Sequence, residues 1–343
     1  MPNIIDLHLF QALGRPLMLA LLGLSALLGF SGAANLMRRE PWREKESRLG
    51  LILVTSLFGL GFGLIGWMHW QINRELPLVL PEQLVAWLNS SLAEANQGAA
   101  YGLPLYDPAH PPRYVIPLWI ENEKYYFWFM SYALVALLAW RRLVNHRFRG
   151  SMLLLLAAQV GLLYTLADPF AEPLPRFFGE IAPWFSPDGD PMAKMGLFMK
   201  LYPRMTFYYN AHYMWLHPPL LFFSYACITL TFLASLFMLG DREPEIERLG
   251  YDAAKFGYLL LTLGMLLGYP WALQAWGPNW WWDPKICSSI MMWAIYSTYL
   301  HTRLYANKVS MWYFSSFLGI LCFAAMIFTF LASFLFPGEH TFQ

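Results

Sequence analysis

The chain has 343 residues, of which 57% are hydrophobic, 18% aromatic and 13% charged, and its formal net charge is +1. A chain this apolar cannot cover the surface of a soluble protein, so we expect an integral membrane protein. The near-neutral charge and the lack of a basic cluster with interleaved aromatic residues argue against a nucleic-acid-binding protein.

Apolar stretches of about 17 to 25 residues recur along the chain, each long enough to cross about 30 Å of hydrocarbon as a helix. We therefore predict an all-α integral membrane protein with about eight transmembrane helices, forming one polytopic domain over residues 1–343. The first stretch has no basic region before it and no small-residue cleavage site after it, so we expect an uncleaved helix. The stretches lie near residues 17–36, 50–70, 125–140, 151–167, 218–239, 256–274, 286–300 and 311–336.

Lys and Arg gather in the loops 37–49, 141–149, 241–255 and 302–310, which share one side of an eight-helix arrangement. The positive-inside rule makes that side cytoplasmic, and we expect the bacterial cytoplasmic (inner) membrane. Both termini and the Trp-rich loop then lie on the outer face. Two large loops also lie there, at 71–124, which is predicted to carry a short helix near 82–95, and at 168–216.

Two histidines lie at predicted outer ends of spans. His217 stands at the mouth of the fifth span, where the following prolines suit a first helical turn, and His340 lies just beyond the last span. A lone histidine at an interface is commonly a hydrogen-bonded surface residue. Two on the same side as a tryptophan cluster instead indicate axial ligands above and below a haem iron.

Residues 271–290 form a Trp-rich loop between two apolar stretches. It holds five tryptophans within twelve residues, followed by Asp283 and Lys285. An aromatic belt at the membrane interface is the simpler explanation. A dense cluster, however, makes a flat apolar surface with charged borders, which suits a planar ligand with polar edges such as a porphyrin.

His301 differs from the outer histidines because it lies at the inner end of the seventh predicted span. An ionisable residue at that depth is costly to desolvate and is a functional candidate, although a histidine snorkelling to the interface is the alternative. His69 lies near the outer end of the second span, about a bilayer's width away, and His146 follows a basic turn. Neither is a good partner for His301.

Cys227, Cys287 and Cys322 all fall in or beside predicted spans and share no CxxC spacing. We expect small buried side chains rather than a zinc site or a redox dithiol. The chain also lacks a CxxCH motif for covalent attachment of its own haem.

The last 140 residues or so resemble a known family. Ala275-Trp276-Gly277, Trp280 and Trp282-Asp283-Pro284-Lys285, followed by a helix that ends in Tyr299-Leu300-His301, are similar to the WWD signature of CcsA/ResC-type haem-handling proteins of cytochrome c biogenesis. The CcmC and CcmF proteins are more distant relatives of that family.

The resemblance implies a non-covalent b-type haem that is held at the outer face and presented to apocytochrome c, as part of a haem lyase or synthase. It implies a second haem, bound by His301 together with a histidine of a CcsB/ResB-like membrane partner. In the outer site His217 and His340 would be the axial ligands. The cradle residues would be Trp271, Trp276, Trp280, Trp282 and Asp283.

The chain also departs from the family pattern. Ile286 stands where the family has an acidic residue, and Val115 replaces a histidine in Val115-Ile116-Pro117-Leu118, which is followed by Glu123. Glu75-Leu76-Pro77-Leu78, in an alternative register, lacks the histidine as well. These departures leave haem binding in place and count against the synthase step.

Two other functions fit parts of the pattern. A haem-containing electron-transfer subunit between the quinone pool and a multihaem cytochrome would also place ligands at both faces. A transporter without a cofactor would need polar residues at the membrane midplane. The nearest such candidate, Asp168-Pro169, lies at the end of a span.

Overall fold

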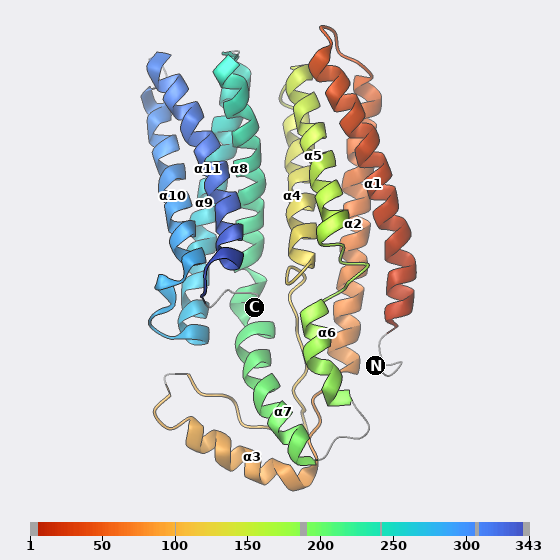
Figure 1. Ribbon diagram of the computed structural model, residues 1–343, viewed down its shortest axis with the longest axis vertical. Coiled ribbons are helices and arrows are strands. Elements are labelled where there is room, and N and C mark those ends of the chain that lie inside the picture. The colour runs from red at the N-terminus through yellow and green to blue at the C-terminus, as the bar shows by residue number, and fades with distance from the viewer. Residues whose placement is uncertain (1–5, 100, 186–190, 241, 306–308, 339–343) are drawn as a thin grey trace.

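The computed structural model describes residues 6–99, 101–185, 191–240, 242–305 and 309–338. Within these ranges the regular structure is helical, apart from one isolated bridge between Pro77 and Arg113, so the predicted all-α fold is confirmed. The long helices stand in two groups side by side (Figure 1). The first group is α1 (Leu7–Met37), α2 (Glu44–Glu75), α4 (Glu123–Trp140) and α5 (His146–Leu166), and the second is α8 (His217–Gly240), α9 (Pro244–Trp276), α10 (Pro284–Thr302) and α11 (Val309–Leu335).

Six helices among the described residues are long and apolar enough to cross a membrane, so the chain is a multi-pass membrane protein. They are α1, α2, α5, α8 with the short turn before it, α9 and α11. The predicted count of eight is not confirmed, because α4 and α10 are shorter and more polar. Glu123 and Lys124 open α4, and α10 carries Lys285, His301 and several Ser and Thr side chains. Both nevertheless run alongside the other helices (Figure 1).

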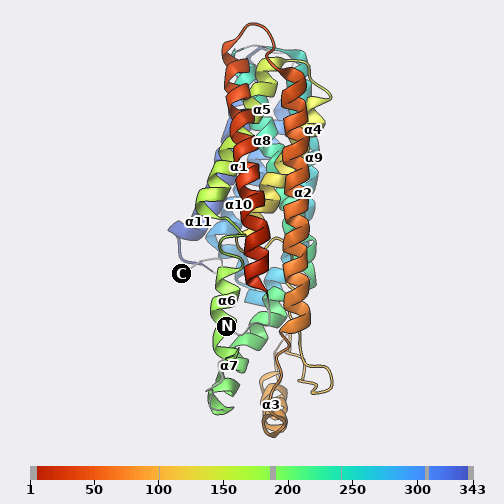
Figure 2. The same cartoon turned by 90° about the vertical axis from the view of Figure 1, so that its right-hand side faces the viewer.

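The end of the molecule that carries the turn between α9 and α10 is called here the Trp-loop end. Three shorter helices lie at this end, and α3 and much of α7 extend beyond the ends of α1 and α2 (Figure 2). The helix predicted near 82–95 is present as α3, whereas the segment 168–216, predicted as a loop, is largely helical. These helices are α3 (Glu82–Ala95), α6 (Pro175–Ile181) and α7 (Pro191–Arg204), and α7 continues into a π-helical turn (Met205–Tyr209) and a 3-10 turn (His212–Trp215).

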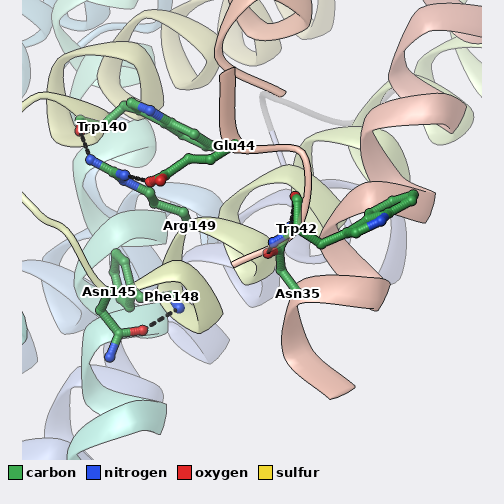
Figure 3. Close-up of polar contacts among 7 residues, drawn as sticks. All are labelled: Asn35, Trp42, Glu44, Trp140, Asn145, Phe148 and Arg149. Atoms are coloured by element: carbon green, nitrogen blue, oxygen red, sulfur yellow. Dashed lines mark hydrogen bonds and ion pairs between the residues drawn. The ribbon is translucent and has the colours of Figure 1, made fainter. Parts of the chain in front are cut away.

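At the opposite end, polar contacts fasten the turns of the first group (Figure 3). Asn35 of α1 donates from Nδ2 to the Trp42 carbonyl (3.1 Å) and accepts from the Trp42 backbone N–H (2.8 Å). Arg149 of α5 pairs with Glu44 of α2 and donates to the Trp140 carbonyl (2.7 Å) at the end of α4. The ends of α1, α2, α4 and α5 are therefore held together where the predicted basic loops 37–49 and 141–149 lie.

Small residues let α1 and α5 approach closely. A Cβ atom added at Gly32 would clash with the Gly150 carbonyl oxygen, and one added at Gly150 would lie 2.7 Å from the Gly32 carbonyl oxygen. Such backbone contact is a common basis for helix association in lipid. The two helix groups meet where α8 packs against α4 and α5.

The cysteines agree only in part with the prediction of buried side chains. Cys227 and Cys322 are buried, and all three thiols are free. Cys287 is exposed, so the prediction is wrong for this residue. It lies in the first turn of α10, where a helix end beside a loop is covered less than a helix centre.

Candidate functional site

His217 begins α8 at the Trp-loop end, as its sequence setting predicted. Pro218 and Pro219 follow it, and proline suits the first turn because its missing N–H would have no partner there. The ring nitrogen Nδ1 lies 2.6 Å from the Gly264 carbonyl oxygen of α9. Only a protonated Nδ1 can donate to that carbonyl, and this tautomer places the imidazole lone pair on Nε2. Such backbone anchoring of one ring nitrogen is typical of histidines that ligate a metal through the other.

The remaining surroundings of His217 fix its ring plane. A Cβ atom added at Gly268 would lie 2.6 Å from Cε1 and 2.7 Å from Nδ1 of the imidazole, so a side chain there would displace the ring. Trp271 stacks over the imidazole with ring centroids 6.3 Å apart and an interplanar angle of 27°. Its own Nε1 donates to the Phe207 carbonyl (2.8 Å). The α9 helix thus supplies both faces of the histidine's setting.

A cavity of about 490 Å³ opens beside His217. Cofactor and small-molecule sites typically measure about 300–1,000 Å³ and have mostly apolar walls with a few polar groups. The walls come from both helix groups and from the π-helical turn, so the cavity depends on their packing. Its aromatic lining includes Trp119, Tyr208, Trp271, Trp276, Trp280 and Phe330.

The tryptophans of the Trp-rich loop divide between two environments. Trp271, Trp276 and Trp280 line the cavity. Trp282 does not; it is 66% exposed and stacks on Trp281 with centroids 4.1 Å apart. The reason is local, because residues 280–282 form a 3-10 turn, in which successive side chains point about a third of a turn apart.

Asp283 has a structural contact that the sequence pattern did not predict. It is buried and caps α10, where its Oδ1 accepts from the backbone N–H groups of Lys285 (2.9 Å) and Ile286 (3.3 Å). A Cβ atom added at Gly338, after the end of α11, would lie 2.5 Å from Asp283 Oδ2. The C-terminal segment therefore runs directly against the Trp-rich loop. His340 lies outside the described residues.

Basic side chains also line the cavity. Lys124 comes from the first turn of α4, Lys285 from the first turn of α10, Arg176 from α6 and Arg204 from the end of α7. Glu121 is the acidic residue among the lining residues. Burial raises the pKa of its carboxyl group. The described lining is thus aromatic with a basic excess.

His301 lies at the other end of the molecule, in the last turn of α10. Its Nδ1 lies 2.8 Å from the Ser297 carbonyl oxygen of the same helix, and its side chain is exposed. His69 is buried in α2 with Nδ1 3.0 Å from the Ile116 carbonyl oxygen, and His146 begins α5 with Nε2 3.3 Å from the Arg38 carbonyl oxygen. The structure does not bring either histidine to His301. Within the described residues no group of three or more His, Cys, Asp or Glu side chains could hold a metal ion.

Several cavity residues come from the segment before α4, which sequence reasoning did not select. Trp119 donates from Nε1 to the Met214 carbonyl (2.6 Å), and both residues line the cavity. The one available signal was the departure from the family pattern at Val115 to Glu123, which spans Trp119. Val115 itself is 45% exposed and does not line the cavity, whereas Ile286, the other departure, does.

Comparison with known proteins agrees with this arrangement. A model of the family described as "Cytochrome C assembly protein" matches residues 119–340. A cytochrome c biogenesis protein CcsA from the cyanobacterium Prochlorococcus marinus is 48% identical over 64 residues, and one from Synechococcus sp. (strain WH7803) is 44% identical over 64 residues. Each match covers 19% of this chain and 20% of the relative, so the chain aligns with about a fifth of these relatives' length.

No solved structure matches the chain significantly. The family match spans well over half of the chain and contains His217, the Trp-rich loop and most of the cavity lining. This chain therefore belongs to the cytochrome c assembly protein family.

Proposed function

We propose that this protein binds haem in the cavity at the Trp-loop end and presents it for covalent attachment to an apocytochrome c. The placement of His217 is the observation that carries the proposal. Its imidazole is anchored through Nδ1 to a backbone carbonyl and lies at the wall of an aromatic cavity of cofactor size. Imidazole is a common axial ligand of haem iron, and aromatic walls suit the faces of a porphyrin.

The Trp-rich loop would divide its tasks. We assign Trp271, Trp276 and Trp280, which line the cavity, to the haem cradle. Asp283 would hold the loop in place through the cap of α10. Trp282, exposed beside Trp281, would form the outer rim that meets the client polypeptide.

His340 is proposed as the second axial ligand. The supporting observation is the position of Gly338, two residues earlier, against Asp283. A short step of chain from that point stays close to the Trp-rich loop, since two residues span at most about 7 Å.

Haem is the cargo here, and its two vinyl groups supply the carbons that the client's thiols attack. Each thiol adds across one vinyl double bond, sulfur to one carbon and hydrogen to the other, so no electrons are gained or lost overall. The chain's own contribution would be to hold the macrocycle in one orientation and to exclude water, and proximity can supply much of such a reaction's acceleration.

A second haem is proposed at the opposite end. His301 is exposed on α10 with Nδ1 engaged by the Ser297 carbonyl, so its other ring nitrogen would serve a ligand shared with a CcsB/ResB-like membrane partner. We place the basic end on the cytoplasmic side of a bacterial inner membrane, by the positive-inside rule. The Trp-loop end then faces the outer compartment, where the client is found.

Haem spectra of the purified full-length protein test the outer site. We expect His217→Ala and His340→Ala each to weaken or shift the reduced-minus-oxidised spectrum, with partial restoration by imidazole. His212→Ala is the matched control, because His212 is exposed five residues before His217 and does not line the cavity. Unchanged spectra in both ligand variants would refute the proposal.

A chase experiment separates presentation from the alternative role as an electron-transfer subunit. Pyridine haemochrome analysis shows whether a client apocytochrome acquires haem from the loaded protein. Transfer of the bound haem supports presentation, whereas haem that stays bound through repeated redox cycles supports the electron-transfer role.

A further inference from the structure

The cavity at the Trp-loop end combines apolar walls with a basic edge. Lys124 and Lys285 lie on helices of different groups, each in the first turn of its helix, and both line the cavity. Their ammonium groups are close enough to repel each other electrostatically. Two like charges beside aromatic walls are costly unless an anion joins them, because a low-dielectric surrounding strengthens both repulsion and attraction.

The nearby carboxylates already have other hydrogen-bonding partners. Glu121 accepts from the backbone N–H groups of Arg176 (2.8 Å) and Phe177 (3.0 Å), and it thereby holds the start of α6. Asp283 accepts from two backbone N–H groups of α10. The cavity lining as a whole therefore keeps a basic excess that an anionic ligand would neutralise.

The two arginines of the cavity are better neutralised than the lysines. Glu180 pairs with Arg176 (Nε–Oε1 3.2 Å) and with Arg204 (Nε–Oε2 2.8 Å). Arg204 also lies over the rings of Tyr208 and Tyr209. These contacts make the arginines part of the wall and leave the lysine pair as the better candidate for contact with a ligand.

We infer that Lys124 and Lys285 bind the two carboxylates of a planar dicarboxylate macrocycle, one lysine to each carboxylate, at the edge of the cavity. The inference rests on the proposed haem site and names its anchoring groups. Charge-assisted hydrogen bonds from ammonium groups to carboxylates are among the stronger polar contacts in proteins. Because the lysines belong to α4 and α10, the bound macrocycle would bridge the two helix groups.

Anchoring the carboxylate edge would fix the rotation of the macrocycle within its own plane. His217 alone cannot do this, since a ring can turn about the bond from iron to nitrogen. With the carboxylates held, the same two edge carbons would always face the side from which a client's thiols approach. Positioning of this kind is what a reaction driven by proximity requires.

Titration with two forms of the ligand tests the inference. Ferric haem and its dimethyl ester, in which both carboxylates are uncharged, are added to the haem-free full-length protein in detergent while the Soret band is followed. We expect the natural chain to bind haem about tenfold more tightly than the ester. The preference should fall below about threefold in the Lys124→Met/Lys285→Met double variant.

Binding of the ester is an internal measure of folding, because the double variant should bind the ester as well as the natural chain does. Lys200→Met is the matched control, since Lys200 is an exposed lysine of α7 that does not line the cavity, and it should keep the full preference. Replacing both lysines with arginine should also keep it. Equal affinities for the two ligands in the natural chain, or an undiminished preference in the double variant, would overturn the inference. No Soret change with either ligand would refute the haem site itself.

Discussion

His217 and His301 are anchored alike but lie in different surroundings. In each, the ring Nδ1 is hydrogen-bonded to a backbone carbonyl, 2.6 Å from Gly264 and 2.8 Å from Ser297. His217 is bonded across to a neighbouring helix that also brings Gly268 and Trp271 against its ring. His301 is bonded to its own helix and is exposed. An anchored imidazole thus becomes part of a cavity only where a second helix supplies walls, and at His301 that second surface would have to come from another polypeptide.

The largest expected effect comes from filling the space beside His217. Gly268→Ala would place a methyl group 2.6 Å from the imidazole, so the ring must turn away and the affinity for haem should fall by about tenfold or more. Haem titration of the purified protein measures this. Gly59→Ala is the control, because a Cβ atom at Gly59 of α2 meets nothing within 4 Å. Equal affinities of the two variants would show that the close fit around His217 is unimportant.

Substitutions within the Trp-rich loop sharpen the comparison next. Trp276 lines the cavity and Trp282 does not, so Trp276→Ala should weaken haem binding about fivefold, the equivalent of about 1 kcal/mol from one aromatic contact. Trp282→Ala should leave the affinity within about twofold of the natural chain. The same titration serves both. A larger loss from Trp282→Ala would mean that the loop rearranges around its ligand.

At the opposite end, the effect should depend on company. His301→Ala should lower the haem content of the complex with the membrane partner by up to about half, and leave that of the isolated chain unchanged, because the second ligand comes from the partner. Haem-to-protein ratios from pyridine haemochrome assays give the answer. If the isolated natural chain already carries two haems, His301 needs no partner and the contrast with His217 disappears.

The smallest effect concerns the two helix caps. Asp283 caps α10 at the Trp-loop end and Asn145 caps α5 at the opposite end, where its Oδ1 accepts from the Phe148 backbone N–H (2.9 Å). Replacing either with Ala should cost about 1 kcal/mol of stability, measured by denaturation in detergent. Only Asp283→Ala should also weaken haem binding, since it alone holds the Trp-rich loop. A matching loss of affinity in Asn145→Ala would point to a general loosening of the fold.

Local signals in the sequence were enough to predict several features. Proline after His217 marked a helix start, and the break at Gly277, where φ is 76°, marked the end of α9. The short helix at 82–95 was recognised because prolines and polar residues surround it. These features depend on neighbours in the chain, so no knowledge of the packing was needed.

Features that depend on packing were not predictable in this way. Trp119 and Lys124 reach the cavity because α8 packs against α4, a contact between segments about a hundred residues apart. The 3-10 turn that separates Trp280 from Trp282 has no signature in a run of identical residues. The excess of predicted spans arose from α4 and α10, whose polar residues give them less apolar character than the helices beside them.

The exposure of Cys287 makes the natural chain its own reporter of sidedness. Cys227 and Cys322 are buried, while the Cys287 thiol lies 3.4 Å from the Trp281 carbonyl oxygen at the edge of the Trp-rich loop. A maleimide that cannot cross lipid would therefore mark one known position without any engineered residue. Added to intact cells and then to inverted vesicles, it would reveal which compartment the tryptophans face. A fluorophore attached there would also be quenched when a haem arrives or leaves, so the same thiol could report loading and unloading in real time.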